Sequence, residues 1–251
     1  MKRSRIFARR CLKETLRDPL SYVFCVGFPV VMLIIFRLIA HYTNGNAFWF
    51  ELPYLTPGII VFSYTFVMLY TAILVAKDKS SSFLGRLFAS PMRAGEFLLG
   101  YALPSIAIGL LQNVACFATA TILGILDQSF FALIDMLKVT IALFPILCFF
   151  ISVGILFGTC FSEKAAPGIA SVVISVAGFL SGAWMPLEEM GGLCTFATCL
   201  PFYPAVRLGR AFTASPSVTF GQDLAVVCAY ALVIGVLSIL AFHRMMKKDN
   251  R

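Results

Sequence analysis

The chain has 251 residues, of which 60% are hydrophobic and 13% are charged, whereas a soluble domain carries roughly 25% charged residues. This composition excludes a soluble protein of this length, which would need far more polar surface to cover its cores. The apolar residues gather in blocks of about 20, the helix length that crosses a hydrocarbon core of about 30 Å, so the sequence predicts an all-α integral membrane protein.

Six of these blocks are predicted to cross the membrane as helices, because backbone groups in lipid must be satisfied within their own segment. Pro29 and Pro145 predict kinks in the first and fourth spans, and Pro104 predicts a kinked or interfacial start of the long third span. We expect a single transmembrane domain over residues 1–251. Its predicted spans are Ser21–Ala40, Pro57–Ala76, Phe97–Leu126, Val139–Cys160, Pro167–Gly182 and Leu224–Phe242.

The positions of Lys and Arg predict the orientation. Of the 20 basic residues, 16 precede the first span or fall in the segments 77–95, 161–166 and the C-terminal tail. Cytoplasmic loops are enriched in Lys and Arg, so both termini are expected in the cytoplasm. The net charge of +8 then reflects topology and anionic lipid headgroups, and does not indicate a nucleic-acid partner. We expect the first span to be an uncleaved signal anchor in a cell membrane, with a bacterial inner membrane favoured by the short loops.

The leader, residues 1–20, is predicted to form an amphipathic helix at the membrane interface. Arg9, Lys13 and Arg17 line one stripe of this helix, and apolar residues recur at near-helical spacing on another. Pro19 is expected to end the helix before the membrane is entered. The alternative is an ordinary basic flank of the first span.

The cytoplasmic loop, residues 77–95, is too apolar for a plain linker. Its apolar residues follow helical spacing between a Ser-rich cap and Pro91, which predicts a short surface helix. The apolar face of this helix either docks into a groove on a partner or lies on the membrane, and the residues alone do not decide between the two. The residues on which a docking role would depend are Asp78, Phe83, Leu84, Arg86, Leu87 and Phe88.

The outer segment, residues 183–222, is largely apolar, but its Glu, Arg and Pro residues prevent a seventh crossing. Two short helices that dip into the outer leaflet as a re-entrant segment fit it best. Cys194 and Cys199 lie in this segment. A disulfide between them is a weak hypothesis, because a separation of five residues on a helix points the side chains apart.

The sequence offers no residues suited to catalysis, to cofactor binding or to metal binding. It contains no G-x-x-x-x-G-K-[ST] motif for ATP phosphates and no Cys/His cluster with metal spacing. We therefore expect no enzyme and no cofactor bound by this chain. Within the predicted spans the only charged residue is Arg37, which argues against a carrier driven by protons or sodium and against a channel with a charged filter.

Gln112 and Asn113 lie near the middle of the third span. An interhelical hydrogen bond, which contributes about 1 kcal/mol, is favoured over contact with a substrate path. The pairs Gly154-x-x-x-Gly158 and Gly178-x-x-x-Gly182 predict close helix packing.

Several motifs follow one another in order over the six spans. They are Leu16-Arg17-Asp18-Pro19, Leu55-Thr56-Pro57-Gly58, the loop Lys77–Pro91, Leu180-Ser181-Gly182-Ala183-Trp184-Met185-Pro186 and Pro201-Phe202-Tyr203-Pro204. In this order they resemble the membrane subunit of ABC-2 type exporters, which are powered by an ATP-binding cassette. The resemblance covers essentially the whole chain.

The resemblance implies a permease that pairs with a second copy or a paralogue and with a separate ATPase subunit, which would bind ATP and Mg²⁺. The leader would be the connecting helix, residues 80–90 the coupling helix, and residues 183–210 a re-entrant gate. The family loop usually carries a Glu two residues before its Arg, where this chain has Leu84 before Arg86. A membrane scaffold or assembly protein without an ATPase partner is the alternative. An apolar drug, a lipid, a peptide and a glycan all fit as substrate.

Overall fold

A computed structural model describes residues 9–14, 17–42, 48–81, 94–127, 131–214 and 219–249. The regular elements in these ranges are all helical. The residues 9–14 form a short helical segment, referred to below as the leader helix. The elements that follow are α2 (Pro19–Tyr22), η1 (Val23–Gly27), α3 (Phe28–Tyr42), η2 (Phe48–Phe50), α4 (Leu52–Ser80), α6 (Ala94–Asp127), α7 (Leu133–Ala142), α8 (Phe144–Cys160), α9 (Ala166–Leu180), η3 (Leu187–Met190), α10 (Gly192–Thr198), α11 (Phe202–Thr213) and α12 (Phe220–Asp249).

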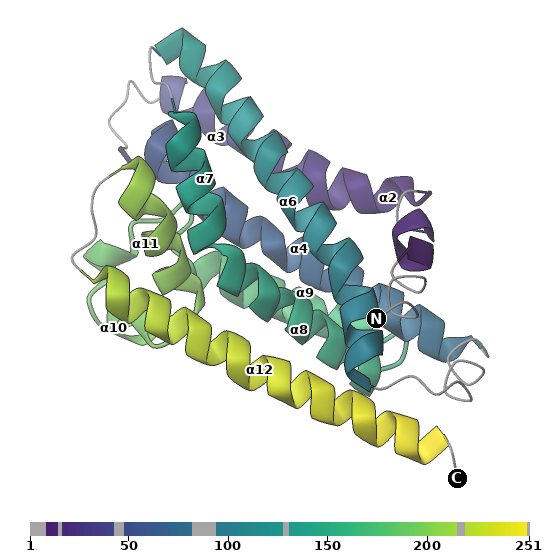
Figure 1. The fold of residues 1–251 in the computed structure, drawn as a ribbon. Helices are drawn as coiled ribbons and strands as arrows, with labels where there is room; N and C mark the ends of the chain where they lie inside the picture. The colour runs from purple at the N-terminus through teal and green to yellow at the C-terminus, as the bar shows by residue number, and fades with distance from the viewer. Residues whose placement is uncertain are drawn as a thin grey trace.

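Helix α4 lies at the centre of the bundle (Figure 1). It packs most extensively against α8 and also contacts α9, α6, α11 and α3. Gly154 and Gly158 of α8 face α4 so closely that a Cβ atom on either would lie 2.5 Å and 2.6 Å from the carbonyl oxygens of Met68 and Ala72. This seam confirms the packing role predicted for the Gly154-x-x-x-Gly158 pair.

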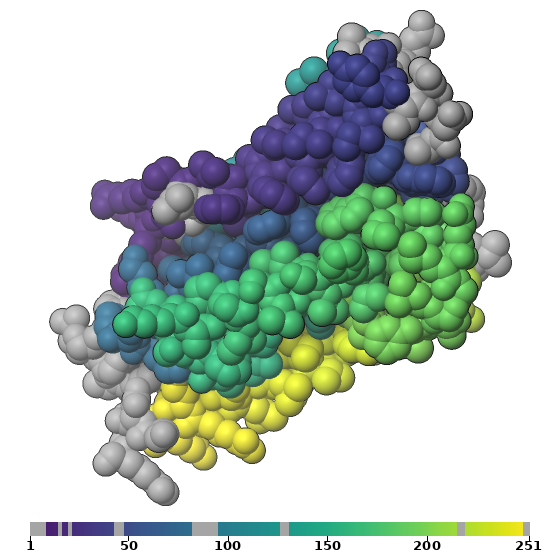
Figure 2. All heavy atoms as spheres, turned by 180° about the vertical axis from the view of Figure 1, so that it is seen from behind, coloured from purple at the N-terminus to yellow at the C-terminus, as the bar shows by residue number. Residues whose placement is uncertain are grey.

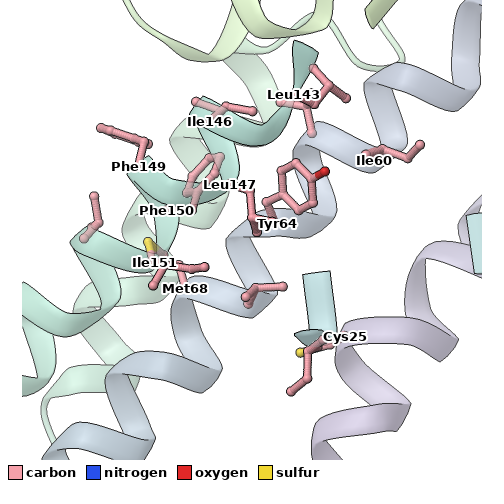
Figure 3. Packing of buried hydrophobic residues seen from close by; sticks show 14 of the residues in the cluster. Cys25, Ile60, Tyr64, Met68, Leu143, Ile146, Leu147, Phe149, Phe150 and Ile151 are labelled. Atoms are coloured by element: carbon pink, nitrogen blue, oxygen red, sulfur yellow. The ribbon is translucent and has the colours of Figure 1, made fainter. Parts of the chain in front are cut away.

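The core lies mainly between α4 and α8, where Tyr64, Met68, Ile146 and Phe150 interdigitate (Figure 3). Tyr64 and Phe150 are fully buried. The ring of Phe150 also stacks on that of Phe202, with centroids 5.8 Å apart, which joins α11 to the same core. The central helix therefore has its apolar partners on several sides.

Two proline predictions correspond to irregular helix geometry. The π-helix η1 ends at Gly27, immediately before the turn of α3 that contains Pro29, whose missing N–H removes a regular backbone hydrogen bond. Helices α7 and α8 meet at a bend of 42°, and Pro145 occupies the first turn after it. Helix α6 is continuous through Pro104. The leader helix does not continue through Pro19, as expected: Arg17 and Asp18 are non-helical, and Pro19 opens α2, a place where proline fits because its N–H needs no partner.

Within the described ranges, four helical segments are long and apolar enough to cross a membrane: Val23–Tyr42, Leu52–Ser80, Gly95–Ile125 and Phe220–Lys247. The bent pair of α7 and α8 would be a fifth crossing. Helix α9, predicted as the fifth of six spans, is apolar but has only 15 residues, whereas a straight crossing takes about 20. The structure therefore supports a multi-pass membrane protein with four or five such spans.

Several predicted boundaries shift. Helix α4 extends to Ser80, so the first four residues of the predicted loop 77–95 are helical. Helix α6 begins at Ala94, three residues before the predicted third span. Helix α12 begins at Phe220, which shortens the outer segment to 183–219. That segment contains two short helices, α10 and α11, preceded by the 3-10 turn η3.

The two ends of the bundle are named here by a residue that each contains. The Asp78 end holds the leader helix, the C-terminal end of α4 and the start of α6, and Phe242 of α12 contacts Phe97 there. The Arg210 end holds the start of α4 and the segment from Gly182 to α11. In Figure 2, α4 is visible between the N-terminal helices on one side and α9 on the other.

Candidate functional site

The last turn of α4 joins several elements at the Asp78 end. Four successive residues, Lys77, Asp78, Lys79 and Ser80, together contact the leader helix, α6 and the end of α8, and they are called the α4 end cluster. Lysine residues in the last helical turn also suit the negative end of the helix dipole. The cluster and Ser81 precede residues 82–93 of the predicted cytoplasmic loop, which lie outside the described residues.

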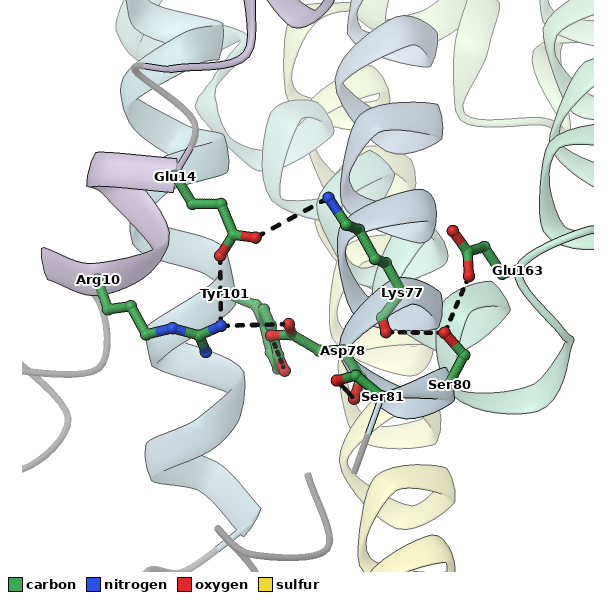
Figure 4. Close-up of polar contacts among 8 residues, drawn as sticks. All are labelled: Arg10, Glu14, Lys77, Asp78, Ser80, Ser81, Tyr101 and Glu163. Atoms are coloured by element: carbon green, nitrogen blue, oxygen red, sulfur yellow. Dashed lines mark hydrogen bonds and ion pairs between the residues drawn. The ribbon is translucent and has the colours of Figure 1, made fainter. Parts of the chain in front are cut away.

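Asp78 is the most enclosed member of the cluster, with 4% of its surface exposed. The hydroxyl of Tyr101 on α6 donates a hydrogen bond of 2.9 Å to its carboxylate, and Arg10 of the leader helix lies 3.7 Å from it (Figure 4). Asp78 was predicted as part of a partner-docking surface. Its carboxylate instead faces α6 and the leader helix inside this chain.

The other members of the cluster reach the leader helix and the end of α8. Lys77 lies 4.0 Å from Glu14, which also pairs with Arg10 at 3.4 Å. Lys79 donates hydrogen bonds of 2.7 Å and 3.2 Å to the carbonyl oxygens of Thr159 and Phe161. Displacing the end of α4 would therefore disturb the leader helix and α8 together.

Ser80, the last member of the α4 end cluster, contacts the segment that follows α8. Its hydroxyl donates to the carboxylate of Glu163 at 2.9 Å (Figure 4). Three of the elements that meet here, α4, α6 and α8, are helices of the apolar bundle. The α4 end cluster therefore links these three helices to the leader helix.

Polar contacts continue along the interface of α4 and α6. Tyr64, Thr71 and Asp78 recur every seven residues, so they share one face of α4. The Tyr64 hydroxyl donates to Asn113 at 2.9 Å, and the hydroxyl groups of Thr71 and Ser105 lie 2.8 Å apart. These contacts fix the register of the two helices over several turns.

Gln112 and Asn113 belong to this interface. The side-chain amide of Gln112 donates to the Ser63 hydroxyl at 2.6 Å and to the Ile60 carbonyl at 3.4 Å. Gln112 is fully buried and Asn113 is 2% exposed. Both residues make the interhelical hydrogen bonds that were favoured for them, and their burial supports packing over contact with a solute.

The leader residues Arg9, Lys13 and Arg17 are exposed, as expected for a basic stripe. Their neighbour Cys11 is buried beneath the leader helix, and this burial raises the pKa of its thiol to about 12. The thiol is therefore protonated and poorly reactive at neutral pH. Helix formation is described for residues 9–14, whereas the remainder of the predicted helix over 1–20 includes residues outside the described ranges.

At the Arg210 end, a buried guanidinium joins the start of α4 to the segment that follows α9. Arg210 donates to the carbonyl oxygens of Tyr54 at 3.0 Å and of Gly182 at 2.7 Å, and it lies over the Tyr54 ring at 3.5 Å. Burial lowers the pKa of Arg210 to about 10, so the side chain is still charged at neutral pH. Gly58 of α4 lies against the backbone of Ala183, where no Cβ would fit.

Two further ionic contacts lie beside Arg210. Arg207 forms an ion pair with the buried carboxylate of Asp223 at the start of α12. Glu188 accepts hydrogen bonds from the hydroxyls of Tyr54 and Tyr203, and burial, followed by the charge of Glu188, raises the pKa of Tyr203. Glu188 therefore serves a structural contact in this arrangement.

The structure contains no disulfide between Cys194 and Cys199, which the sequence left as a weak hypothesis. Cys194 and Cys199 are free thiols, with Cys194 in α10 and Cys199 immediately after it. Phe83, Leu84, Arg86, Leu87 and Phe88, the other residues predicted for docking, lie outside the described residues.

Reasoning from the sequence missed Tyr101, Arg10 and Arg210 as structural anchors. The seven-residue recurrence of Tyr64, Thr71 and Asp78 was a usable signal for a polar helix face. Nothing comparable marks Arg210, because its partners are backbone carbonyl groups brought together by the fold.

A model of the ABC-2 type transporter family matches residues 3–212. The chain therefore belongs to this family and is a membrane-spanning transport permease, as its motifs suggested. The matched range contains both the α4 end cluster and Arg210, and it ends before α12. No curated protein matches the chain.

Proposed function

We propose that this chain is the membrane subunit of an ATP-driven exporter. In this proposal two copies, or one copy and a paralogue, form the substrate path. Each is coupled to a separate ATP-binding subunit that carries ATP and Mg²⁺. Membership of the ABC-2 type transporter family supports a transport function. The ionisable side chains described above gather at the two ends of the bundle, which is consistent with an energy source outside the apolar part of the chain.

The observation that carries the coupling proposal is the position of the α4 end cluster. Its four residues lie just before residues 82–93, the remainder of the predicted loop, and contact α6, the leader helix and the end of α8. A partner that moved this loop would act on three elements at once. We therefore assign the loop as the ATPase-docking segment, with the Asp78 end and both termini in the cytoplasm.

The opposite end of the molecule would then form the outer gate. The segment from Gly182 through α11 is fastened to the start of α4 through Arg210. Because α4 connects this attachment to the α4 end cluster, movement of α4 would carry both. We propose that the segment is re-entrant and opens when nucleotide closes the paired ATPases.

The docking assignment is tested by the triple variant Phe83→Asp, Leu87→Asp and Phe88→Asp. Three carboxylates on the apolar face of the loop should abolish recovery of the ATPase subunit with the tagged permease, because burying unpaired charges at an interface is costly. Leu133→Asp is the control, since Leu133 is 83% exposed at the start of α7, outside both the loop and the proposed gate. Full transport and full ATPase recovery in the triple variant would contradict the assignment.

A further inference from the structure

Two adjoining hollows lie at the N-terminal segment. The first, of about 650 Å³, is lined by Arg9, Arg10, Lys13, Glu14 and Arg17. The second, of about 600 Å³, lies between the N-terminal segment and α4, and it shares Glu14 and Arg17 with the first. Because they share these residues, the two hollows adjoin each other. The remaining lining residues give them different chemistry.

The first hollow has an excess of positive charge. Its lining contains four cations and one carboxylate. That carboxylate, Glu14, is already paired with Arg10 at 3.4 Å and lies 4.0 Å from Lys77. Lys13 and Arg17 are exposed, and Arg and Lys side chains are the usual partners of phosphate groups. The hollow therefore suits a phosphate-bearing anion.

The second hollow is mostly apolar beyond a charged mouth. Phe66, Leu69 and Ile73 line it from one face of α4, at spacings of three and four residues, and Phe24 lines it from η1. Phe24 is 50% exposed, and its π-helical segment widens the backbone at this point. A cavity of about 300–1,000 Å³ is of the size that holds small ligands, and this lining suits a hydrocarbon chain.

The order of the two hollows matches the depth profile of a lipid leaflet. The basic residues up to Arg17 come shortly before the apolar span Val23–Tyr42, so they lie at the level of the lipid headgroups. The apolar hollow lies beside the start of that span. We propose that the two hollows together bind one anionic phospholipid, with its phosphate among Arg9, Lys13 and Arg17 and one acyl chain against Phe24 and α4.

A lipid held there would rest against the leader helix and α4 close to the α4 end cluster, because Lys77 of that cluster lines the apolar hollow together with Glu14, which lies 4.0 Å from it. The site requires neither an ATPase partner nor transport, so it stands or falls separately from the proposed function.

The test uses the full-length protein with Phe24→Trp as a reporter, reconstituted in phosphatidylcholine vesicles. The vesicles contain a small fraction of either phosphatidylglycerol or phosphatidylcholine brominated on the acyl chains, because bromine quenches tryptophan fluorescence on contact. The protein without the reporter substitution gives the background from Trp49 and Trp184, which lie before α4 and in the segment after α9. We expect stronger quenching of the reporter by brominated phosphatidylglycerol.

A matched pair of double variants localises the effect. Lys13→Gln with Arg17→Gln should reduce the preference for the anionic lipid by roughly 5-fold for each charge removed. Lys247→Gln with Arg244→Gln, exposed residues near the end of α12, should leave it unchanged. Equal quenching by the two brominated lipids would overturn the proposal. A preference that both double variants lose equally would also overturn it, because general surface charge would then be the cause.

Discussion

Replacement of Gly154 by alanine is expected to separate α4 from α8. The new methyl group would lie 2.5 Å from the carbonyl oxygen of Met68 and 2.8 Å from Cβ of Thr71. The first distance is about 0.9 Å shorter than the 3.4 Å at which ordinary van der Waals contact begins. A backbone carbonyl in a helix cannot rotate away, so the two helices must move apart along their closest seam.

The expected cost follows from these contacts. Overpacking of this kind costs about 1–3 kcal/mol, and the better helix propensity of alanine offsets about 0.5–1 kcal/mol. The middle of each range gives a net loss of about 1 kcal/mol, which would lower Tm by roughly 2–4 °C for a chain of this size. Tm in detergent can be measured by heating samples and quantifying the monodisperse fraction by size-exclusion chromatography.

Gly168→Ala is the matched control for this prediction. Gly168 is also helical, in α9, and no atom lies within 4 Å of a Cβ built there. Its replacement should leave Tm unchanged or raise it slightly, because only the propensity gain remains. If the Gly154→Ala protein were as stable as the Gly168→Ala protein, the close seam between α4 and α8 would be refuted.

Three further predictions concern the two ends of the bundle. Asp78→Asn should keep the ATPase bound but lower ATP-dependent transport at least severalfold, because the contact with Tyr101 weakens; unchanged transport per ATP hydrolysed would contradict a role in coupling. Arg210→Gln should lower Tm by several degrees, since buried carbonyl groups lose a charged donor that contributes about 1.5–3 kcal/mol; an unchanged Tm would exclude the attachment described above. In oriented vesicles, an impermeant maleimide should label Cys199 only from the outside and Cys160 only from the inside, as both thiols are exposed; labelling of the two from one side would reverse the topology assignment.

Much of the fold could be predicted because lipid imposes simple rules on the sequence. Long apolar runs identified α4, α6 and α12, and Pro145 marked the bend between α7 and α8. Helix α9 shows where these rules end. Its 15 residues are apolar, but composition alone does not say whether so short a helix crosses the membrane.

Less of the candidate site could be predicted, because its partners are distant in the sequence. Asp78 was predicted as a docking residue from its place in the loop, whereas its contacts with Tyr101 and Arg10 join three separate segments. Gln112 and Asn113 were assigned correctly to helix packing, since amides in the middle of an apolar helix need partners on a neighbour. The partners themselves, Ser63 and Tyr64, were set by the register of α4 against α6.

The central claim, that this permease works with a separate ATPase, is tested most directly by purification from native membranes. The C-terminally tagged protein would be solubilised gently, and the co-purifying proteins identified and assayed for vanadate-sensitive ATP hydrolysis. The account predicts a stoichiometric ATP-binding-cassette subunit with this activity. A clean permease without any ATPase, reproduced in a milder detergent, would contradict the coupling proposal and favour a scaffold role.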